Sequence, residues 1–314
     1  MLPDDAAGAL APAKPCAPAS RTGSIFFLGD PLATLDQEWD SSLRLMAAHR
    51  ARGDAATWSS YDDVLISGRT LVLNGRPVGE GDLVWLRFDP SVSVRYYETL
   101  RALCHVDARF INRPETVLTV HDKRSALSLC PRPTWSVFAA GQLAGVVAEM
   151  AHLGVETAVL KPPSLFASKG VRFLPAGDRA ALEAGFADLV GLFGYVIVEP
   201  YLGPGGGHPP VDMRVLMTSR RVIGAIERVI PVGGGLHDVK RAGPFTPEQA
   251  RLVQAALEFM RAEGIFLAGL DFLGDTLTEL NVSCPGAIPE INLFCDVVAE
   301  EEIIADVHHA WVAI

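Results

Sequence analysis

The sequence predicts a mixed α/β (α+β) protein with three lobes, and three patterns support this prediction. Aliphatic runs alternate with helix-like stretches and Gly/Pro punctuation in the first part of the chain, which is typical of an open parallel sheet. In the middle, three strands and a helix follow one another within few residues, which favours a small antiparallel sheet covered by helices. Nearer the C-terminus, two apolar strands joined by Gly274-Asp275 indicate a β-hairpin.

The predicted N-terminal lobe spans residues 23–116 and follows an Ala/Pro-rich extension, residues 1–22, that we expect to be disordered. A buried strand at Ser24–Leu28 ends at the Gly29-Asp30-Pro31 loop, and a helix at Asp40–Arg52 follows. The remaining elements of this lobe are strands at Thr57–Ser59, Leu71–Leu73, Leu83–Leu86 and Arg109–Asn112 and a helix at Val92–Ala102. Because strands and helices alternate, we expect parallel pairing.

The other two lobes are predicted at residues 117–200, a small central lid, and 201–314, an antiparallel C-terminal lobe. The elements expected in the central lobe are helices at His121–Leu129, Ala140–His152 and Arg179–Phe193 and strands at Thr157–Lys161, Gly170–Leu174 and Tyr195–Glu199. Those expected in the C-terminal lobe are strands at Asp212–Met217, Val222–Ile230, Phe266–Phe272 and Thr276–Val282 and a helix at Pro247–Glu263.

Charge and composition exclude some classes of function. The net charge of −10 and the pI of about 5.3 argue against nonspecific nucleic-acid binding, because an acidic surface repels the phosphate backbone. No apolar run approaches the ~20 residues that cross a bilayer, so we expect no membrane partner. The N-terminus lacks a secretion signal, and the five cysteines are scattered without metal-ligand spacing. We therefore expect a cytoplasmic protein.

The hairpin carries the most informative polar residues. Asp271 lies at the end of one strand, and Glu279 and Asn281 lie two residues apart on the next, so these two side chains share a face. Two carboxylates and an amide form the oxygen-rich set that Mg²⁺ prefers. The alternative interpretation is a solvated sheet face with ordinary alternation.

Other residues add positive charge and a linker. Lys161 ends an apolar strand and Lys123 lies at a helix start, where each is a candidate for a phosphate, although ordinary solvated lysines look the same. The Glu199-Pro200-Tyr201-Leu202 linker offers backbone groups that can read an adenine edge. Arg214 is expected to hold a phosphate or carboxylate, or to pair with Asp212 on the same strand face.

The order of these motifs resembles the prokaryotic glutathione synthetases of the ATP-grasp superfamily. The matching segments are Lys161-Pro162, Glu199-Pro200-Tyr201-Leu202, Asp212-Met213-Arg214-Val215-Leu216 and the run from Gly269 to Ser283. Matching segments of the first lobe are Gly29–Ala33, the helix start at Asp40-Ser41-Ser42, Leu86–Pro90, Ile111–Pro114 and Asp122-Lys123. The resemblance covers nearly everything from Gly23 to about Glu290, and it implies the ATP-grasp fold with ATP and Mg²⁺ as cofactors.

The resemblance also implies roles by position. The residues expected at the nucleotide are Lys123 and Lys161 on the phosphates, Glu199, Tyr201 and Leu202 on the adenine and ribose, and Arg214 on the transferred phosphoryl group. Arg214 and Lys161 would thus be catalytic. Mg²⁺ would be bound by Asp271, Glu279 and Asn281. The residues expected at the substrates are Ser283 and Cys284 on the acceptor side and Asp30, Arg87 and Asp89 on the carboxylate side.

Two segments depart from the family pattern. The loop at residues 163–170 has a single glycine, at its end, where the family has a glycine-rich lid. The segment after Arg228 lacks the family's Arg-Gly-Asn and looks shortened over residues 232–241. Lys240 and Arg241 are candidates to replace the lost charge, and His237 and Asp238 are candidates for a proton relay, although a solvated polar loop is an equal interpretation.

The resemblance implies an ATP-dependent ligase that joins a carboxylate to an amine. Phosphorylation of the acid creates an acyl phosphate with a good leaving group, and charge neutralisation and alignment supply the catalysis. The expected partners are small amino-acid-like or peptide substrates, and the family suggests a possible homo-oligomer. Two alternatives remain: an intramolecular ring-closing ligase of the D-cycloserine-forming type, and a nucleotide-binding protein that has lost turnover.

Overall fold

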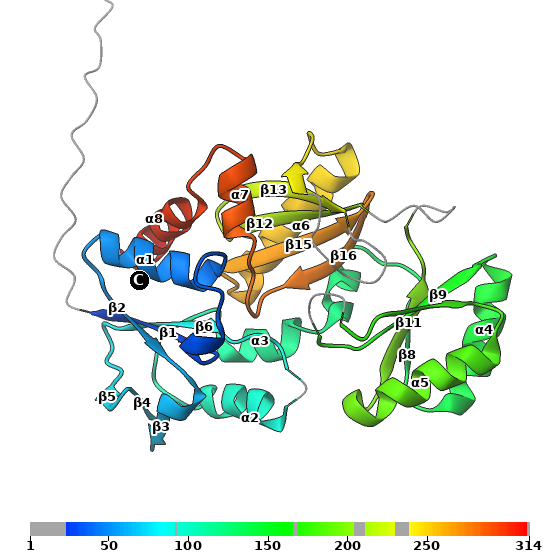
Figure 1. Cartoon of the computed structure of the whole chain (residues 1–314), viewed down its shortest axis with the longest axis horizontal. Coiled ribbons are helices and arrows are strands. Elements are labelled where there is room, and N and C mark those ends of the chain that lie inside the picture. Colours follow the sequence, from blue (N-terminus) through cyan, green and yellow to red (C-terminus); the bar gives the residue numbers. More distant parts are fainter. Residues whose placement is uncertain (1–22, 92, 166–168, 204–210, 230–238, 313–314) are drawn as a thin grey trace, which may run out of the picture.

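The computed structural model describes residues 23–91, 93–165, 169–203, 211–229 and 239–312 (Figure 1). The prediction of a disordered extension at residues 1–22 and those made for His237 and Asp238 lie outside the described residues. Within these ranges the strands form four sheets: a parallel sheet, a small three-stranded sheet beside it, a four-stranded antiparallel sheet and a five-stranded antiparallel sheet. No helix within the described ranges is both long and apolar enough to cross a membrane.

The N-terminal sheet is parallel, as the sequence predicts. Its order is β2-β1-β6-β7, with β1 (Ser24–Gly29), β2 (Ala55–Ser59), β6 (Leu83–Arg87) and β7 (Phe110–Ile111). The helix α1 (Ser41–Ala51) begins where it does because the Asp40 carboxylate accepts hydrogen bonds from the Ser42 and Leu43 amides. Two more helices follow, α2 (Val94–Leu103) and α3 (Pro114–Val120).

The small sheet consists of β3 (Val64–Ser67), β4 (Thr70–Leu73) and β5 (Arg76–Pro77), of which the sequence analysis predicted only β4. Short 3-10 helices, which the sequence analysis did not predict, lie at η1 (Leu32–Thr34) and η2 (Tyr61–Asp63). The core between this sheet, the parallel sheet, α2 and α3 contains Phe26, Leu71, Val84, Tyr96 and Val117. All of the site residues expected in the first lobe are carried by loops and strand ends of this part.

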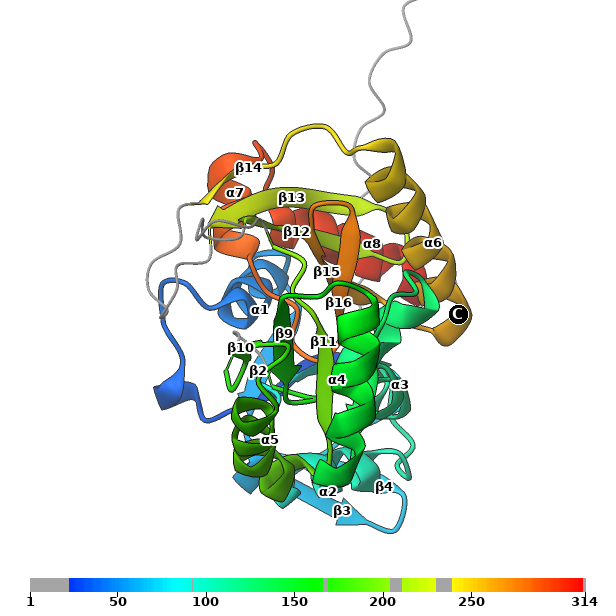
Figure 2. The ribbon, with the colours of Figure 1, turned by 90° about the vertical axis from the view of Figure 1, so that its right-hand side faces the viewer.

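The second sheet is antiparallel and has its own hydrophobic core. Its order is β10-β9-β11-β8, with β8 (Trp135–Val137), β9 (Thr157–Lys161), β10 (Arg172–Pro175) and β11 (Val196–Pro200). The helices α4 (Leu143–His152) and α5 (Arg179–Phe193) pack against each other and against this sheet, and η4 (Ala140–Gln142) leads into α4 (Figures 1 and 2). The described core residues of this cluster all lie between Trp135 and Val198.

The third sheet is antiparallel throughout and holds the predicted hairpin. Its order is β14-β13-β12-β15-β16, with β12 (Val211–Thr218), β13 (Val222–Val229), β14 (Val239–Arg241), β15 (Leu267–Leu273) and β16 (Thr276–Asn281). The helix α6 (Pro247–Glu263) begins at a capping box of Thr246 and Gln249 and ends at Gly264. The helices α7 (Ile288–Phe294) and α8 (Ala299–Val312) were not predicted.

The two faces of this sheet have different neighbours. One face, with Val215 and Phe272, packs under α6 and also takes Ala126 from η3 (Lys123–Ser128). On the other face, Leu216 and Leu267 share one core with the parallel sheet, α1, α7 and α8. The rest of that second face is polar, and it carries most of the residues that the sequence analysis singled out.

Candidate active site

A β-bulge places the two candidate metal carboxylates opposite each other. In β15 and β16, Phe272 pairs with Leu277 but Asp271 pairs with Glu279, so Thr278 is an extra residue in β16. The Thr278 hydroxyl donates a hydrogen bond of 3.0 Å to the Asp271 carbonyl. Since the register shifts by one residue, Leu277 is buried while Glu279 turns to the polar face. Asp271 and Glu279 therefore share the polar face of the sheet.

Arg214 lies next to Asp271 in the neighbouring strand β12 and pairs with it directly. Its Nε and Nη2 both donate to the Asp271 carboxylate, the latter at 2.6 Å, and the two side chains are only 13% and 11% exposed. Burial by itself raises the pKa of Asp271, but the positive charge of Arg214 outweighs it and holds that pKa below 3.8. Asp212 instead pairs with Arg228, so the alternative pairing of Arg214 with Asp212 was wrong.

A glycine makes room for this arginine. A Cβ atom on Gly269 of β15 would lie 3.3 Å from Cδ of Arg214, so the missing side chain lets Arg214 lie flat across the sheet. Gly269 pairs with Asn281, which places the Asn281 amide one position further along the same face as Glu279. The Asn281 side-chain oxygen accepts a 3.3 Å hydrogen bond from Ser283.

Lys123 brings a second positive charge to the carboxylates. It begins η3, and its ammonium lies 3.1 Å from the Glu279 carboxylate. The Lys123 side chain is 10% exposed and that of Glu279 is 25% exposed. Arg228 also reaches the Asp271 carboxylate, at 3.3 Å. Three cationic side chains therefore converge on two carboxylates.

A second charged group connects the antiparallel sheets. Glu199, 2% exposed in β11, accepts hydrogen bonds from Lys161 of β9 and from Arg132, the latter at 3.3 Å. Arg132 also donates to the carbonyls of Leu277 and Thr278 at 2.8 and 3.3 Å. The sequence analysis missed Arg132 because it lies in a Pro-rich connection. The residues after Glu199 continue as a linker with half-buried Tyr201 and Leu202, and the Tyr201 amide donates to the Thr157 carbonyl.

In the first lobe, Arg87 is buried and joins two parts of the chain. It donates to Ser42 at 2.8 Å and to the carbonyl of Pro285 at 3.0 Å. Its charge is thereby directed at the turn that follows β16. Asp30 and Asp89 lie together at the nearby strand ends, since the Asp89 amide donates to Asp30 at 3.0 Å. Loss of hydration and the negative charge of Asp30 raise the pKa of Asp89.

The other predicted substrate residues separate into two groups. Ser283 is buried, and Cys284 donates to the Arg87 carbonyl at 3.6 Å. Burial raises the pKa of Cys284 to about 12, so this thiol stays protonated and is a poor nucleophile. Lys240 lies in the edge strand β14 and pairs with Glu227, which faces away from Arg228 and the carboxylates. The structure therefore does not bring Lys240 to the site.

A cavity that the sequence did not indicate lies beside η3. It has a volume of about 250 Å³ and is lined by residues of α2, α3, α5 and the loop after β9. At its wall, Tyr97 donates to the Ser164 hydroxyl at 2.6 Å, and His121 lies 2.9 Å from the Ser164 carbonyl. Burial lowers the pKa of His121, so the imidazole is neutral at pH 7.

Comparison with known proteins shows which family the chain resembles. The family model "Prokaryotic glutathione synthetase, ATP-grasp domain" matches residues 155–296, the range that contains Lys161, Glu199, Arg214, Asp271 and Glu279. The glutathione synthetase of Synechococcus elongatus is 28% identical, over 90% of this chain and 97% of its own length. That of Thermosynechococcus vestitus is 27% identical, over 85% and 94%. This chain is thus an ATP-dependent ligase that is similar to the glutathione synthetases.

Solved structures agree on the fold of this ligase. D-cycloserine synthetase DcsG matches with a TM-score of 0.66 and 19% identity, over 90% of this chain and 99% of its own. D-alanyl-alanine synthetase A from Vibrio cholerae matches with a TM-score of 0.63 and 12% identity, over 94% and 100%. The predicted ATP-grasp fold is thus confirmed. The ligase uses ATP and Mg²⁺ and forms a C–N bond, and the two alternatives, ring closure and binding without turnover, are not favoured.

Proposed function

We propose that this ligase activates the carboxylate of a small amino-acid-like or peptide substrate as an acyl phosphate and joins it to an amine. The observation that carries the proposal is the facing pair of Asp271 and Glu279, with Lys123, Arg214 and Arg228 converging on it. Buried charges of both signs in one place suit a reaction in which negative charge moves between oxygen atoms.

Asp271, Glu279 and Asn281 would hold the Mg²⁺. The donor set fits a hard cation, because all three side chains offer oxygen and project from one face of the β15–β16 hairpin. When bound, the ion neutralises charge on the phosphate oxygens. Both carboxylates contact cationic side chains in this structure, so Mg²⁺ would replace part of these contacts when the cationic side chains turn to the phosphates.

The lysines and arginines would take the phosphates. Lys123 and Arg214 contact carboxylates in this structure, and a triphosphate offers them stronger, more highly charged acceptors. Arg214 lies beside Asp271 and would stabilise the transferred phosphoryl group, while Lys161 would approach from the second sheet. Since the Glu199 carboxylate is engaged by Lys161 and Arg132, recognition of the adenine would fall to the linker after it, with Tyr201 and Leu202.

The substrates would lie between the first lobe and the turn after β16. Asp30 and Asp89 would border this region, and Ser283 and Cys284 would line it from the turn after β16. Because Arg87 is 4% exposed and bonded to the Pro285 carbonyl, we assign it the positioning of this turn. His237 lies outside the described residues, and its role at the acceptor stays a prediction.

The predictions from the sequence about the three lobes, the partners and the cellular location remain part of this proposal. Residues 23–116, 117–200 and 201–314 would act as substrate, lid and catalytic lobes, although Val120 and Ala126 pack under the third sheet. The acidic charge supports a protein that does not bind nucleic acid, and the cysteine pattern supports a cytoplasmic location. We further propose that the protein binds no membrane and forms a homo-oligomer.

The test measures ADP formation from ATP and Mg²⁺ with a panel of amino acids and γ-linked dipeptides, each acid with and without an amine acceptor. We expect ADP to form only in the presence of a particular acid. Lys161→Met should weaken nucleotide binding by about 10- to 150-fold, which corresponds to the about 1.5–3 kcal/mol of a hydrogen bond to a charged group.

Lys240→Met is the matched control, because Lys240 is 71% exposed and faces away from the carboxylates. It should leave the nucleotide Kd unchanged. Equal affinity in wild type and Lys161→Met would remove Lys161 from the site. Tight ATP binding with no turnover across the whole panel would refute the proposed substrate class.

A further inference from the structure

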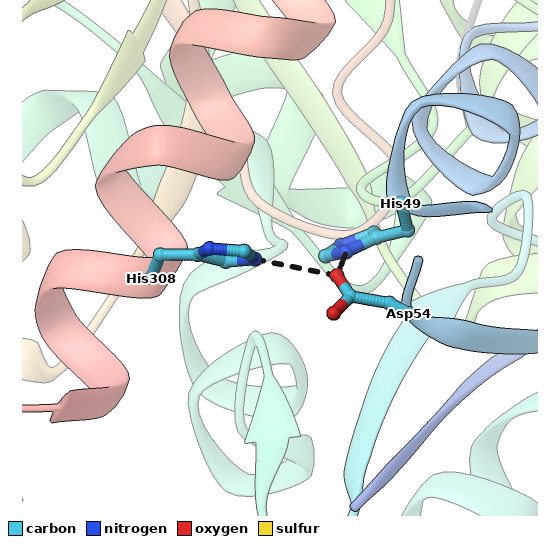
Figure 3. A group of neighbouring side chains, drawn as sticks. All are labelled: His49, Asp54 and His308. Carbon is cyan, nitrogen blue, oxygen red and sulfur yellow. Dashed lines mark hydrogen bonds and ion pairs between the residues drawn. The ribbon is translucent and has the colours of Figure 1, made fainter. Parts of the chain in front are cut away.

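A cluster of two histidines and an aspartate lies where α1 meets α8, apart from the residues assigned to the nucleotide. His49 comes from α1, Asp54 from the turn after it and His308 from α8 (Figure 3). His49 Nδ1 lies 2.7 Å, and His308 Nε2 3.3 Å, from the same carboxylate oxygen of Asp54. One ligand atom from each of the three residues lies within 4.8 Å of the others.

We propose that His49, Asp54 and His308 form a binding site for a divalent transition metal, with Zn²⁺ as the ion of choice, that fastens α8 to the N-terminal lobe. This inference is independent of the proposed substrate. Two imidazoles and a carboxylate are a ligand set that suits zinc, with a fourth position for water. Mg²⁺, which prefers oxygen ligands alone, would not compete well here.

The separations of the two histidine nitrogens from the Asp54 oxygen are close to those that zinc requires. With bonds of about 2.0–2.1 Å, a tetrahedral ion separates its ligand atoms by about 3.3 Å. The Asp54–His308 distance is already 3.3 Å, and the His49–Asp54 distance of 2.7 Å needs to open by a few tenths of an ångström. The three side chains point toward one another in Figure 3, and all three ligand atoms lie within 4.8 Å of one another.

The backbone holds these ligands in place. Gly53 adopts a left-handed conformation, with φ of 87°, that reverses the chain after α1. The Asp54 amide then donates to the His49 carbonyl at 3.1 Å, which fixes the carboxylate beside the imidazole. α8 packs directly on α1, so His308 is presented by a rigid element. A site whose ligands are already ordered loses little entropy on binding.

The surroundings are apolar and allow access from one side. His49 is fully buried, and its ring packs edge-on against Phe27 and Trp85 with centroid distances of 6.0 and 6.2 Å. The His308 side chain is 21% exposed. An apolar wall strengthens metal–ligand interactions, while the partly exposed histidine gives the ion a route from solvent.

The test is zinc binding by the full chain after treatment with chelator, in the absence of nucleotide. We expect one Zn²⁺ per chain, a rise in Tm on adding zinc, and visible absorption typical of a tetrahedral site on adding cobalt. His308→Ala changes a partly exposed residue and should fold. It should lower zinc affinity by more than the roughly 10- to 100-fold that loss of an outer-shell partner costs.

His309→Ala is the matched control, because His309 is the next residue of α8 and is exposed. It should bind zinc as the wild type does. Asp54→Asn keeps the shape and a hydrogen-bond acceptor but loses the charge, so it should also lose zinc. Zinc bound equally by wild type and His308→Ala, at cysteines or at the active-site carboxylates, would overturn the proposal, as would the absence of zinc binding to the wild type.

Discussion

The pair of Arg214 and Asp271 gives the sharpest prediction for stability. In Asp271→Asn, the two arginine donors face an amide with one oxygen, and the buried positive charge of Arg214 loses the negative charge that it is hydrogen-bonded to. Both side chains are nearly buried, at 13% and 11% exposed. Breaking a buried pair of this kind costs about 3–5 kcal/mol, and the remaining amide oxygen places the expected loss near the lower end of that range.

Urea unfolding of wild type and variant measures this loss. The matched control is Asp107→Asn, which breaks another two-pronged Arg–Asp contact, with Arg69, whose side chains are 68% and 66% exposed. Solvent screens that pair, so the unfolding midpoint should not move. If both variants shift the midpoint equally, the buried Arg214–Asp271 pair contributes no more to stability than the exposed Arg69–Asp107 pair, and the reasoning from burial is wrong.

Acid titration checks the sign of the same effect. Burial raises the pKa of Asp271 but the charge of Arg214 outweighs it, so the folded-state pKa lies below 3.8. The stabilisation is therefore fully present above the pKa of the unfolded chain and is lost as the pH falls through the lower folded value. The difference in unfolding free energy between wild type and Asp271→Asn should stay constant near neutrality and shrink below pH 3.8.

Two further substitutions test the walls of the site. Gly269→Ala places a methyl group 3.3 Å from Cδ of Arg214 and should lower kcat more than it raises the KM for ATP. Overpacking should also lower the free energy of unfolding by about 1–3 kcal/mol. Gly243→Ala is the control, because no atom lies within 4 Å of the added Cβ, and it should change neither the kinetics nor the stability. Cys284→Ala should keep turnover within a few-fold of wild type, because a thiol with a pKa of about 12 is not the nucleophile, and a loss of turnover beyond a hundredfold would contradict this.

Local signals in the sequence were enough for most elements. The bounds predicted for the helix Pro247–Glu263 are those observed, because Thr246 caps its start, proline occupies the first turn and Gly264 ends it. α7 is seven residues long and stabilised mainly by burial of Ile288 and Ile291, which local propensity does not reveal. α8 did carry a signal, since Ile303, Ile304 and Val307 form an apolar stripe.

The candidate site could be predicted only in part, for a physical reason. Side chains two apart on one strand must share a face, so Glu279 and Asn281 could be grouped from the sequence. Which side chains pair across neighbouring strands depends on the strand register, which the local sequence does not determine. The sequence alone therefore could not show that Arg214 pairs with Asp271 of the neighbouring strand and not with Asp212 of its own strand. The β-bulge has a signal in the sequence. Leu277 and Leu280 are both apolar and both buried, although strict alternation would place them on opposite faces of the sheet.

Because the second sheet has its own hydrophobic core, the charged residues of the candidate site belong to two separately packed units. Lys161 and Glu199 are carried by one packed unit, whereas Asp271, Glu279 and Arg214 are carried by another. Among the described residues, Arg132 spans the gap through hydrogen bonds, which can break and re-form without exposing apolar surface. The hydrophobic core of the second sheet can therefore stay intact when Lys161 and Glu199 move relative to Asp271 and Glu279, so the geometry around a nucleotide is adjustable at little cost in apolar packing.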